Sequence, residues 1–242
     1  MADRFPAAGS HLERYAARFN AVEINSSFYR PHRPQTYQRW AAATPEGFRF
    51  AVKAPRTITH ERRLADCEYL IQAFLDQIEL LGDRLGPILV QLPPSLAFDP
   101  GLVEVFFRDL RGRFSGPVAC EPRHPSWFEP AADRLLATHR IARVAADPAP
   151  DPRAATPGGW SDFRYIRLHG SPRIYYSTYG SDRLAALART LDPESPETWI
   201  IFDNTALGAA AEDALALSEI LATNGAPAWP AAGGVCARSP CG

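Results

Sequence analysis

The chain has 242 residues, of which 46% are hydrophobic and 22% charged, a composition typical of a globular protein with one large domain or two small ones. Its 26 basic and 27 acidic residues give a formal net charge of -1, which excludes the strong basic field of a general nucleic-acid-binding protein. The four dispersed cysteines and the missing apolar signal or spanning segment predict a cytoplasmic protein without a zinc finger, a disulfide framework or a membrane partner.

In chain order, short apolar or aromatic runs alternate with segments of helical periodicity. Seven runs are predicted as strands: 21–25, 48–53, 87–92, 117–121, 141–146, 163–169 and 198–203. Helices are predicted over 10–19, from residue 34 onward, and over 62–82, 101–111, 129–139, 181–191 and 207–223. Segment 147–162 is too rich in proline and glycine for a helix, so we expect an ordered loop there. The pattern indicates a single α/β domain over residues 1–225, followed by a mobile or aberrant tail over 226–242.

Polar side chains stand at the end of nearly every predicted strand. Examples are Glu23, Lys53, Glu121, Arg167 and Asp203. An open parallel sheet concentrates its ligand groups at one switch point, whereas a barrel collects them from all its strands around one mouth. We therefore predict a TIM-type (β/α)8 barrel. Because such a barrel has eight strands and only seven are found, the prediction is a barrel that lacks its first strand.

The same segments resemble a known family. The matching stretches are VEINSSFYRP (22–31), Trp40, TPEGFRFAVKAPRTITH (44–60), LGPILVQLPPS (86–95), CEPRHPSW (120–127), YIRLHG (165–170) and FDNT (202–205). They are similar to the YecE-like proteins, called domain of unknown function 72, from Leu12 to about Leu221. The resemblance implies a TIM-type barrel and no established chemistry. The chain departs from the family by lacking its glycine-rich first strand and by its ending, AWPAAGGVCARSPCG.

Four residues near the expected mouth are predicted to be catalytic: Glu23, Glu121, Lys53 and His169. Two carboxylates on opposite sides of a mouth can act as acid and base, or as nucleophile and acid, depending on their separation. The alternative is that Arg123, Arg167 or Lys53 holds each carboxylate in a buried ion network. For Lys53 we favour ion pairing with Glu23 or anion binding over Schiff-base chemistry, because an ion pair keeps the amine protonated.

A wider set of residues is predicted to bind substrate: Asn25, Tyr29, His60, Gln91, Arg123, Trp127, Arg167, Asp203 and Asn204. Arginines interleaved with aromatic rings suit a phosphate, a sugar or a stacked base. The alternative for Trp127 is packing of its loop, and the alternative for His60 is capping of a helix that begins near Glu61.

A divalent metal, magnesium or manganese, is a less favoured hypothesis. Glu23, Glu121, His169 and Asp203 would make an oxygen-rich site with one imidazole, which suits these ions. However, the sequence contains no H-x-H or H-E-x-x-H spacing to support it.

Three functions are compatible with the sequence. The favoured one is an enzyme, a hydrolase or isomerase, that uses the carboxylates as acid and base and the basic groups as charge stabilisers on a small polar, anionic or sugar-like substrate. The second is a nucleic-acid-binding or processing protein, which the near-neutral charge disfavours. The third is a barrel that binds a small molecule without catalysis.

Overall fold

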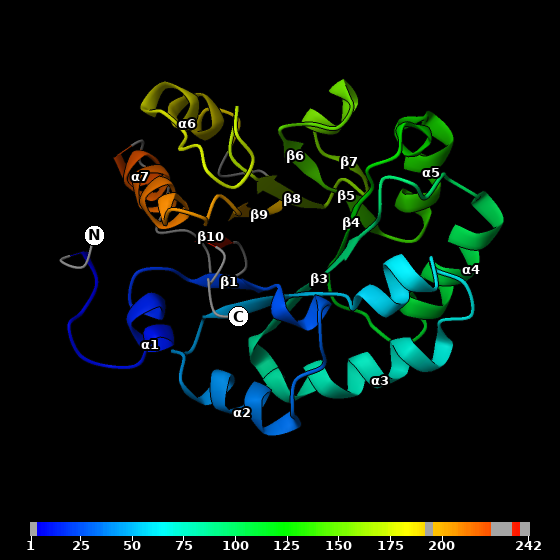
Figure 1. Cartoon of the computed structure of the whole chain (residues 1–242), viewed down its shortest axis with the longest axis horizontal. Helices are drawn as coiled ribbons and strands as arrows, with labels where there is room; N and C mark the ends of the chain where they lie inside the picture. Colours follow the sequence, from blue (N-terminus) through cyan, green and yellow to red (C-terminus); the bar gives the residue numbers. More distant parts are fainter. Residues whose placement is uncertain (1–3, 192–195, 224–233, 238–242) are drawn as a thin grey trace.

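The computed structural model describes residues 4–191, 196–223 and 234–237, in which strands and helices alternate (Figure 1). The first half contains α1 (His11–Ala16), β1 (Ala21–Ile24), α2 (Pro34–Ala42), β2 (Arg49–Lys53), α3 (Glu68–Ile78), β3 (Leu85–Gln91), α4 (Pro100–Arg111), β4 (Val118–Glu121) and α5 (Pro130–Thr138). The second half contains β5 (Ile141–Arg143), β6 (Ala145–Asp147), β7 (Gly158–Gly159), β8 (Phe163–Leu168), α6 (Ser181–Ala188), β9 (Glu197–Phe202), α7 (Ala209–Thr223) and β10 (Gly234–Ala237). The predicted α/β class is confirmed.

The strands form two sheets, in the orders β1-β2-β3-β4-β5-β7 and β10-β9-β8-β6. All neighbours are parallel except β7, which runs antiparallel to β5. The predicted strand 141–146 is divided at Val144, whose N–H donates to the Cys120 carbonyl at 2.9 Å. Its first part pairs with β4 and its second part pairs with β8, so the two sheets meet along this segment.

The outer edges of the two sheets also approach each other. β10 lies beside β1, between it and β9, as Figure 1 shows. No ladder joins β1 to β10 within the described residues, so the sheet is not closed and the predicted barrel is not confirmed. β10 falls inside the segment that was expected to be a tail, of which 226–233 and 238–242 lie outside the described residues.

The alternation of side chains along the strands separates two kinds of core. Outward-facing residues pack against helices, for example Val52 against the helices of the first half and Ile200 against α6 and α7. Inward-facing residues form a central cluster: Ala21, Ala51, Leu89, Ala119, Ala142, Val144, Phe163, Tyr165, Trp199 and Ile201. Gly86 of β3 shows how tightly this cluster is packed, because a Cβ there would lie 2.8 Å from the Trp199 ring of β9.

The connection from β6 to β8 differs from the others. The predicted loop 147–162 contains a 3-10 turn (Pro152–Ala155) and β7, and no α-helix. A cavity of about 710 Å³ therefore lies against the outer face of β8, lined among others by Ile166, Leu168 and Leu184.

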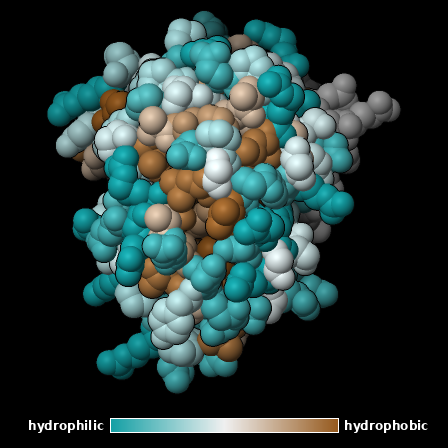
Figure 2. All heavy atoms as spheres, turned by 90° about the vertical axis from the view of Figure 1, so that its right-hand side faces the viewer, coloured by the Kyte–Doolittle hydropathy of each residue, from teal (hydrophilic) through white to brown (hydrophobic). Residues whose placement is uncertain are grey.

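Figure 2 shows the side of the molecule that carries α4 and α5, where a band of hydrophobic residues runs between hydrophilic ones.

The predicted helix 62–82 is shorter than expected. Arg63, Leu64 and Asp66 all have positive φ angles, which an α-helix does not accept, so α3 begins only at Glu68. A 3-10 segment from Glu79 to Arg84 follows it. No helix in the described part of the chain is both long and apolar enough to cross a bilayer.

Candidate functional site

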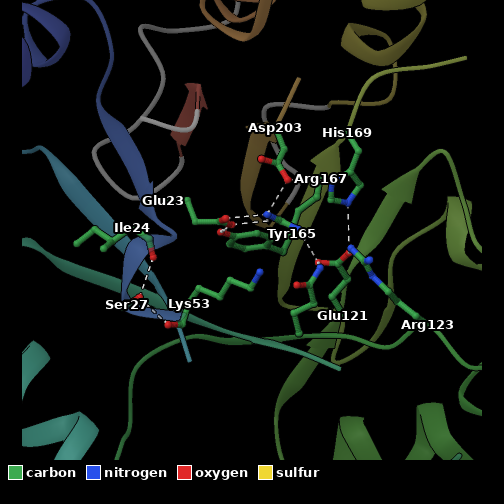
Figure 3. Close-up of polar contacts among 11 residues, drawn as sticks. Glu23, Ile24, Ser27, Lys53, Glu121, Arg123, Tyr165, Arg167, His169 and Asp203 are labelled. Atoms are coloured by element: carbon green, nitrogen blue, oxygen red, sulfur yellow. Dashed lines mark hydrogen bonds and ion pairs between the residues drawn. The ribbon is translucent and has the colours of Figure 1, made fainter. Parts of the chain in front are cut away.

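Polar side chains occupy the same inward face as the central apolar cluster, two residues further along each strand. This relation holds for Ala21 and Glu23, Ala51 and Lys53, Leu89 and Gln91, Ala119 and Glu121, Tyr165 and Arg167, and Ile201 and Asp203. Because the parent strands are parallel, these groups meet at one end of the sheet, as Figure 3 shows. The expected convergence of Glu23, Lys53, Glu121, Arg167, His169 and Asp203 is thus present in the structure.

Arg167 lies at the centre of this group with 1% of its surface exposed. Its Nε and Nη2 donate to the two oxygens of Glu23 at 3.1 and 2.8 Å. Its Nη1 donates to Glu121 at 2.7 Å, and Nη2 also contacts Asp203 at 3.2 Å. Burial acts to lower the pKa of Arg167, but the three carboxylates outweigh it and hold this pKa well above its ordinary value. The guanidinium is therefore a permanent charge that organises three buried carboxylates.

His169 extends this ion network. Its Nδ1 lies 3.0 Å from Asp203 and its Nε2 lies 3.2 Å from Glu121. Burial acts to lower the pKa of His169, but hydrogen bonds to Asp203 and Glu121 raise it above the usual value. The imidazole is therefore biased towards the imidazolium form, in which both nitrogens donate.

Glu121 is correspondingly held as an anion. Burial acts to raise its pKa, but Arg167, His169 and Arg123 together keep the pKa well below the ordinary value of a carboxyl. Gln91 adds a hydrogen bond from Nε2 at 3.1 Å, and Arg123 adds one from Nη2 at 3.2 Å. A carboxylate with these partners cannot supply a proton near neutral pH.

Lys53 behaves differently from the other charged groups. Its side chain is 6% exposed, and its Nζ lies over the Phe28 ring, 4.2 Å from the centroid. It forms no ion pair in the described part of the chain, so the expected pair with Glu23 is wrong. Lys53 does not pair with Glu23 because the Glu23 oxygens already accept hydrogen bonds from other groups. These come from the Arg167 guanidinium and from the Tyr165 hydroxyl, the latter at 2.9 Å.

The environment of Lys53 lowers its pKa to about 8, first through burial and then through the positive charge of Arg167. Glu23, Glu121 and Asp203 act in the opposite direction, but they do not cancel these two effects. At pH 7 this raises the neutral amine from less than a thousandth to about a tenth of the molecules.

The residues of the site differ in how far solvent reaches them. Arg167 and Glu121 are 1% and 2% exposed, whereas Lys53, Asn25 and Gln91 are 6–7% exposed. The last three retain slightly more contact with solvent than Arg167 and Glu121. Asn25 Oδ1 is buried and has no hydrogen-bond partner among the described residues, so a ligand that donates a hydrogen bond would satisfy it.

Two predicted binding residues lie at the rim. Tyr29 is 64% exposed and packs edge-on against Phe28. The His60 ring also packs edge-on against Phe28, with 4.9 Å between the ring centroids, and burial, Lys53 and Arg123 lower its pKa. The alternative that His60 caps a helix is wrong, because it lies inside a short π-helical turn (Thr57–Glu61).

Two others lie away from this group. Trp127 is fully buried, donates from Nε1 to the Leu96 carbonyl at 2.9 Å and packs against Phe98, which are the contacts of a core residue. Asn204 donates to the Ser177 carbonyl and to Asp213 of α7, and so ties the loop after β8 to that helix.

Sequence reasoning missed Tyr165 and Phe28. Tyr165 precedes Arg167 by two residues and shares its face, so the alternation in YIRLH is a signal that could have identified it. Phe28 gave no such signal, because a turn (Ser26–Phe28) places its ring under Lys53. A further signal is compositional: Lys53 is the single lysine of a chain that contains 25 arginines.

The described residues contain no group of three or more His, Cys, Asp and Glu side chains arranged to hold a metal ion. The carboxylates of the less favoured metal hypothesis converge instead on the Arg167 guanidinium.

Comparison with known proteins places this arrangement in a family. The model of a family described as "Protein of unknown function DUF72" matches residues 3–233. The UPF0759 protein YecE of Escherichia coli K12 is 35% identical over 147 residues, which cover 57% of this chain and 53% of that protein. The UPF0759 protein YunF of Bacillus subtilis 168 is 30% identical over 132 residues, covering 51% and 46%. The chain thus spans about half the length of these relatives.

Solved structures agree over a larger part of the chain. A DUF72 family protein from Thermotoga maritima MSB8 is similar with a TM-score of 0.73 and 27% identity, covering 90% of this chain and 92% of that one. A second, from Enterococcus faecalis V583, has a TM-score of 0.75 and 25% identity, covering 88% and 93%. The chain therefore belongs to the YecE-like DUF72 family.

Proposed function

We propose that the protein is an enzyme that binds a small polar substrate with an anionic group at the strand ends and transfers protons on it, as in an isomerisation. The observation that carries the proposal is Lys53, a buried amine with a pKa of about 8 and no carboxylate partner in the described part of the chain. An amine that titrates near neutral pH can both take and return a proton.

The charge of the surroundings supports an anionic substrate. The three negative charges of the buried carboxylates are balanced by Arg167, His169 and the Lys53 ammonium. Arg123, at the rim, adds a further positive charge. A carboxylate or phosphate group would therefore be attracted to this end of the sheet.

In this proposal the carboxylates do not exchange protons, which differs from the acid and base roles expected for Glu23 and Glu121. Both are bound by Arg167, and Glu121 is held ionised. Their role is to fix the positive charges of Arg167 and His169 in position, where they stabilise negative charge that develops on the substrate. We favour isomerisation over hydrolysis because isomerisation needs a group that takes a proton and returns it, and the Lys53 amine can do both.

The test is proton exchange in deuterated water, followed by proton NMR on oxo acids, hydroxy acids and sugar phosphates. The wild-type protein is expected to introduce deuterium next to a carbonyl or hydroxyl group, and Lys53→Met is expected to reduce the rate by about 10²- to 10⁴-fold. Arg183→Ala is the matched control, because Arg183 carries a charge in an exposed pair with Asp147. Binding without exchange would instead favour the non-catalytic barrel, and equal rates in both variants would contradict the assignment of Lys53.

We further propose that the two sheets together form a closed (β/α)8 barrel. Counting β5 and β6 as one divided strand, β1, β2, β3, β4, β5–β6, β8, β9 and β10 supply eight parallel strands. Cys236→Pro removes a backbone N–H from β10, so it is expected to destabilise the fold by on the order of 2 kcal/mol relative to Cys236→Ala. Equal stability of the two variants in urea would show that β10 does not complete the sheet.

A further inference from the structure

We infer that Lys53 is a nucleophile that forms a covalent imine with the carbonyl carbon of a small aldehyde or ketone bearing an anionic group. This inference rests on the proposed function and narrows its substrate class. Charge alone does not explain why a lysine, and not an arginine, stands at position 53.

The chain carries 25 arginines and one lysine, so arginine meets almost every need for a positive charge in this protein. The single lysine is buried at the end of β2, inside the polar group of the strand ends. Arginine stays protonated at all relevant pH values, and only lysine can present a neutral amine there. The position therefore requires an amine and not merely a cation.

The surroundings of Lys53 favour this chemistry. The Nζ atom rests on the Phe28 ring and points towards the space between Glu23 and Glu121, as Figure 3 shows for the labelled side chains. No carboxylate pairs with it in the described part of the chain, so no ion pair has to be broken before it reacts. A buried lysine beside a second cation is an activated nucleophile, because burial and the positive charge of Arg167 both disfavour its protonated form.

The reaction balances without an oxidant, a reductant or a cofactor. The neutral amine attacks the carbonyl carbon, a C–N bond forms, and the carbonyl oxygen takes up protons and leaves as water. The net change converts an ammonium group and a carbonyl group into a protonated imine and one water molecule. The imine nitrogen then withdraws electrons from the neighbouring carbon, which makes its C–H bond more acidic. Because Lys53 is now covalently bound, solvent water takes up that proton and returns one.

Asn25 and Arg123 indicate the substrate class. Asn25 Oδ1, buried and without a partner among the described residues, can accept a hydrogen bond from a substrate hydroxyl. Arg123 is one third exposed and lies 3.2 Å from Glu121, and its guanidinium can also pair with a carboxylate or phosphate. The substrate is therefore a small hydroxylated or simple carbonyl compound with one anionic group.

The experiment is reductive trapping of the full chain with borohydride in the presence of pyruvate, glyoxylate or dihydroxyacetone phosphate as probes. A secondary amine is expected at Lys53, detected by mass spectrometry as a tryptic peptide that spans residues 50–56, because trypsin no longer cleaves after the modified lysine. The N-terminal amine is the only other primary amine, apart from any added tag, and its peptide serves as an internal reference. An adduct confined to the N-terminus would overturn the inference.

Two variants separate the inference from the proposed function. Lys53→Arg keeps the charge and loses the amine, so it is expected to retain binding of small anions by calorimetry and to lose all trapping. Lys53→Met is expected to lose both, while Arg183→Ala keeps both. Anion binding and proton exchange in the wild type without any Lys53 adduct would refute the imine and leave the proposed function standing. Absence of anion binding in the wild type would refute both.

Discussion

Two cations at the strand ends, Arg167 and Lys53, experience opposite environments within one polar group. Arg167 makes hydrogen bonds to three carboxylates, and its pKa is raised. Lys53 has no ion pair in the described part of the chain, and burial and the positive charge of Arg167 lower its pKa to about 8. The comparison shows that burial by itself does not decide the state of a charge, because the partners of each group do. One cation stabilises the site, and the other is left available for chemistry.

The strongest test of this contrast is removal of Arg167. Arg167→Met leaves buried Glu23 without a cation and removes one from Glu121 and Asp203, so we expect the free energy of unfolding to fall by about 3–5 kcal/mol in urea titration. Arg183→Ala, which removes an exposed charge, should cost no more than about 1 kcal/mol. Similar losses in the two variants would show that Arg167 does not organise the site.

The next largest effect concerns Glu121 and the dependence of stability on pH. Glu121→Gln is expected to cost about 1.5–3 kcal/mol at pH 7, because hydrogen bonds to a charged acceptor are lost. The folded pKa of Glu121 lies well below 4.5, so its stabilisation is present above that pH and is lost as the pH falls through the folded pKa. Unfolding measured between pH 7 and 3 should therefore be steeper in the wild type than in the variant. Parallel curves would contradict the assignment of this acid sensitivity to Glu121.

Removal of the Lys53 amine should stabilise the fold, in contrast to the two preceding variants. Lys53→Met is expected to raise the free energy of unfolding by roughly 1–3 kcal/mol at pH 7, since a buried amine with a depressed pKa opposes folding while it is charged. The folded pKa of about 8 lies below the ordinary 10.5, so wild-type stability should rise between these values relative to Lys53→Met. Thermal unfolding at pH 7, 8, 9 and 10 measures this difference. A destabilised variant at pH 7 would mean that Lys53 is structural.

The smallest expected effect concerns Tyr165. Tyr165→Phe removes one hydrogen bond to Glu23, whose carboxylate keeps both contacts with Arg167. We expect a loss of about 0.5–1.5 kcal/mol in urea titration and no change in the trapping of Lys53. A loss comparable to that of Arg167→Met would show that the hydroxyl, and not the guanidinium, holds Glu23.

The sequence allowed the strands and the polar ends to be predicted because both depend on local alternation. It did not reveal which charges pair: Glu23 bonds to Arg167, more than 140 residues away, and not to Lys53. Such pairing depends on distances across the interior, which no local pattern encodes. For the same reason Trp127, in a loop rich in polar residues, could not be assigned to the core in advance. β10 was missed because four residues beside glycine and proline give too short a pattern.

The burial of the single lysine makes the site directly observable. Selective labelling of the lysine Nζ with nitrogen-15 would give one side-chain nitrogen resonance in this chain, and that resonance would belong to Lys53. Its chemical shift across a pH series would report the protonation of this amine without any mutation, and its perturbation by an added compound would locate that compound. The protein thus contains its own spectroscopic probe where the chemistry is proposed to occur.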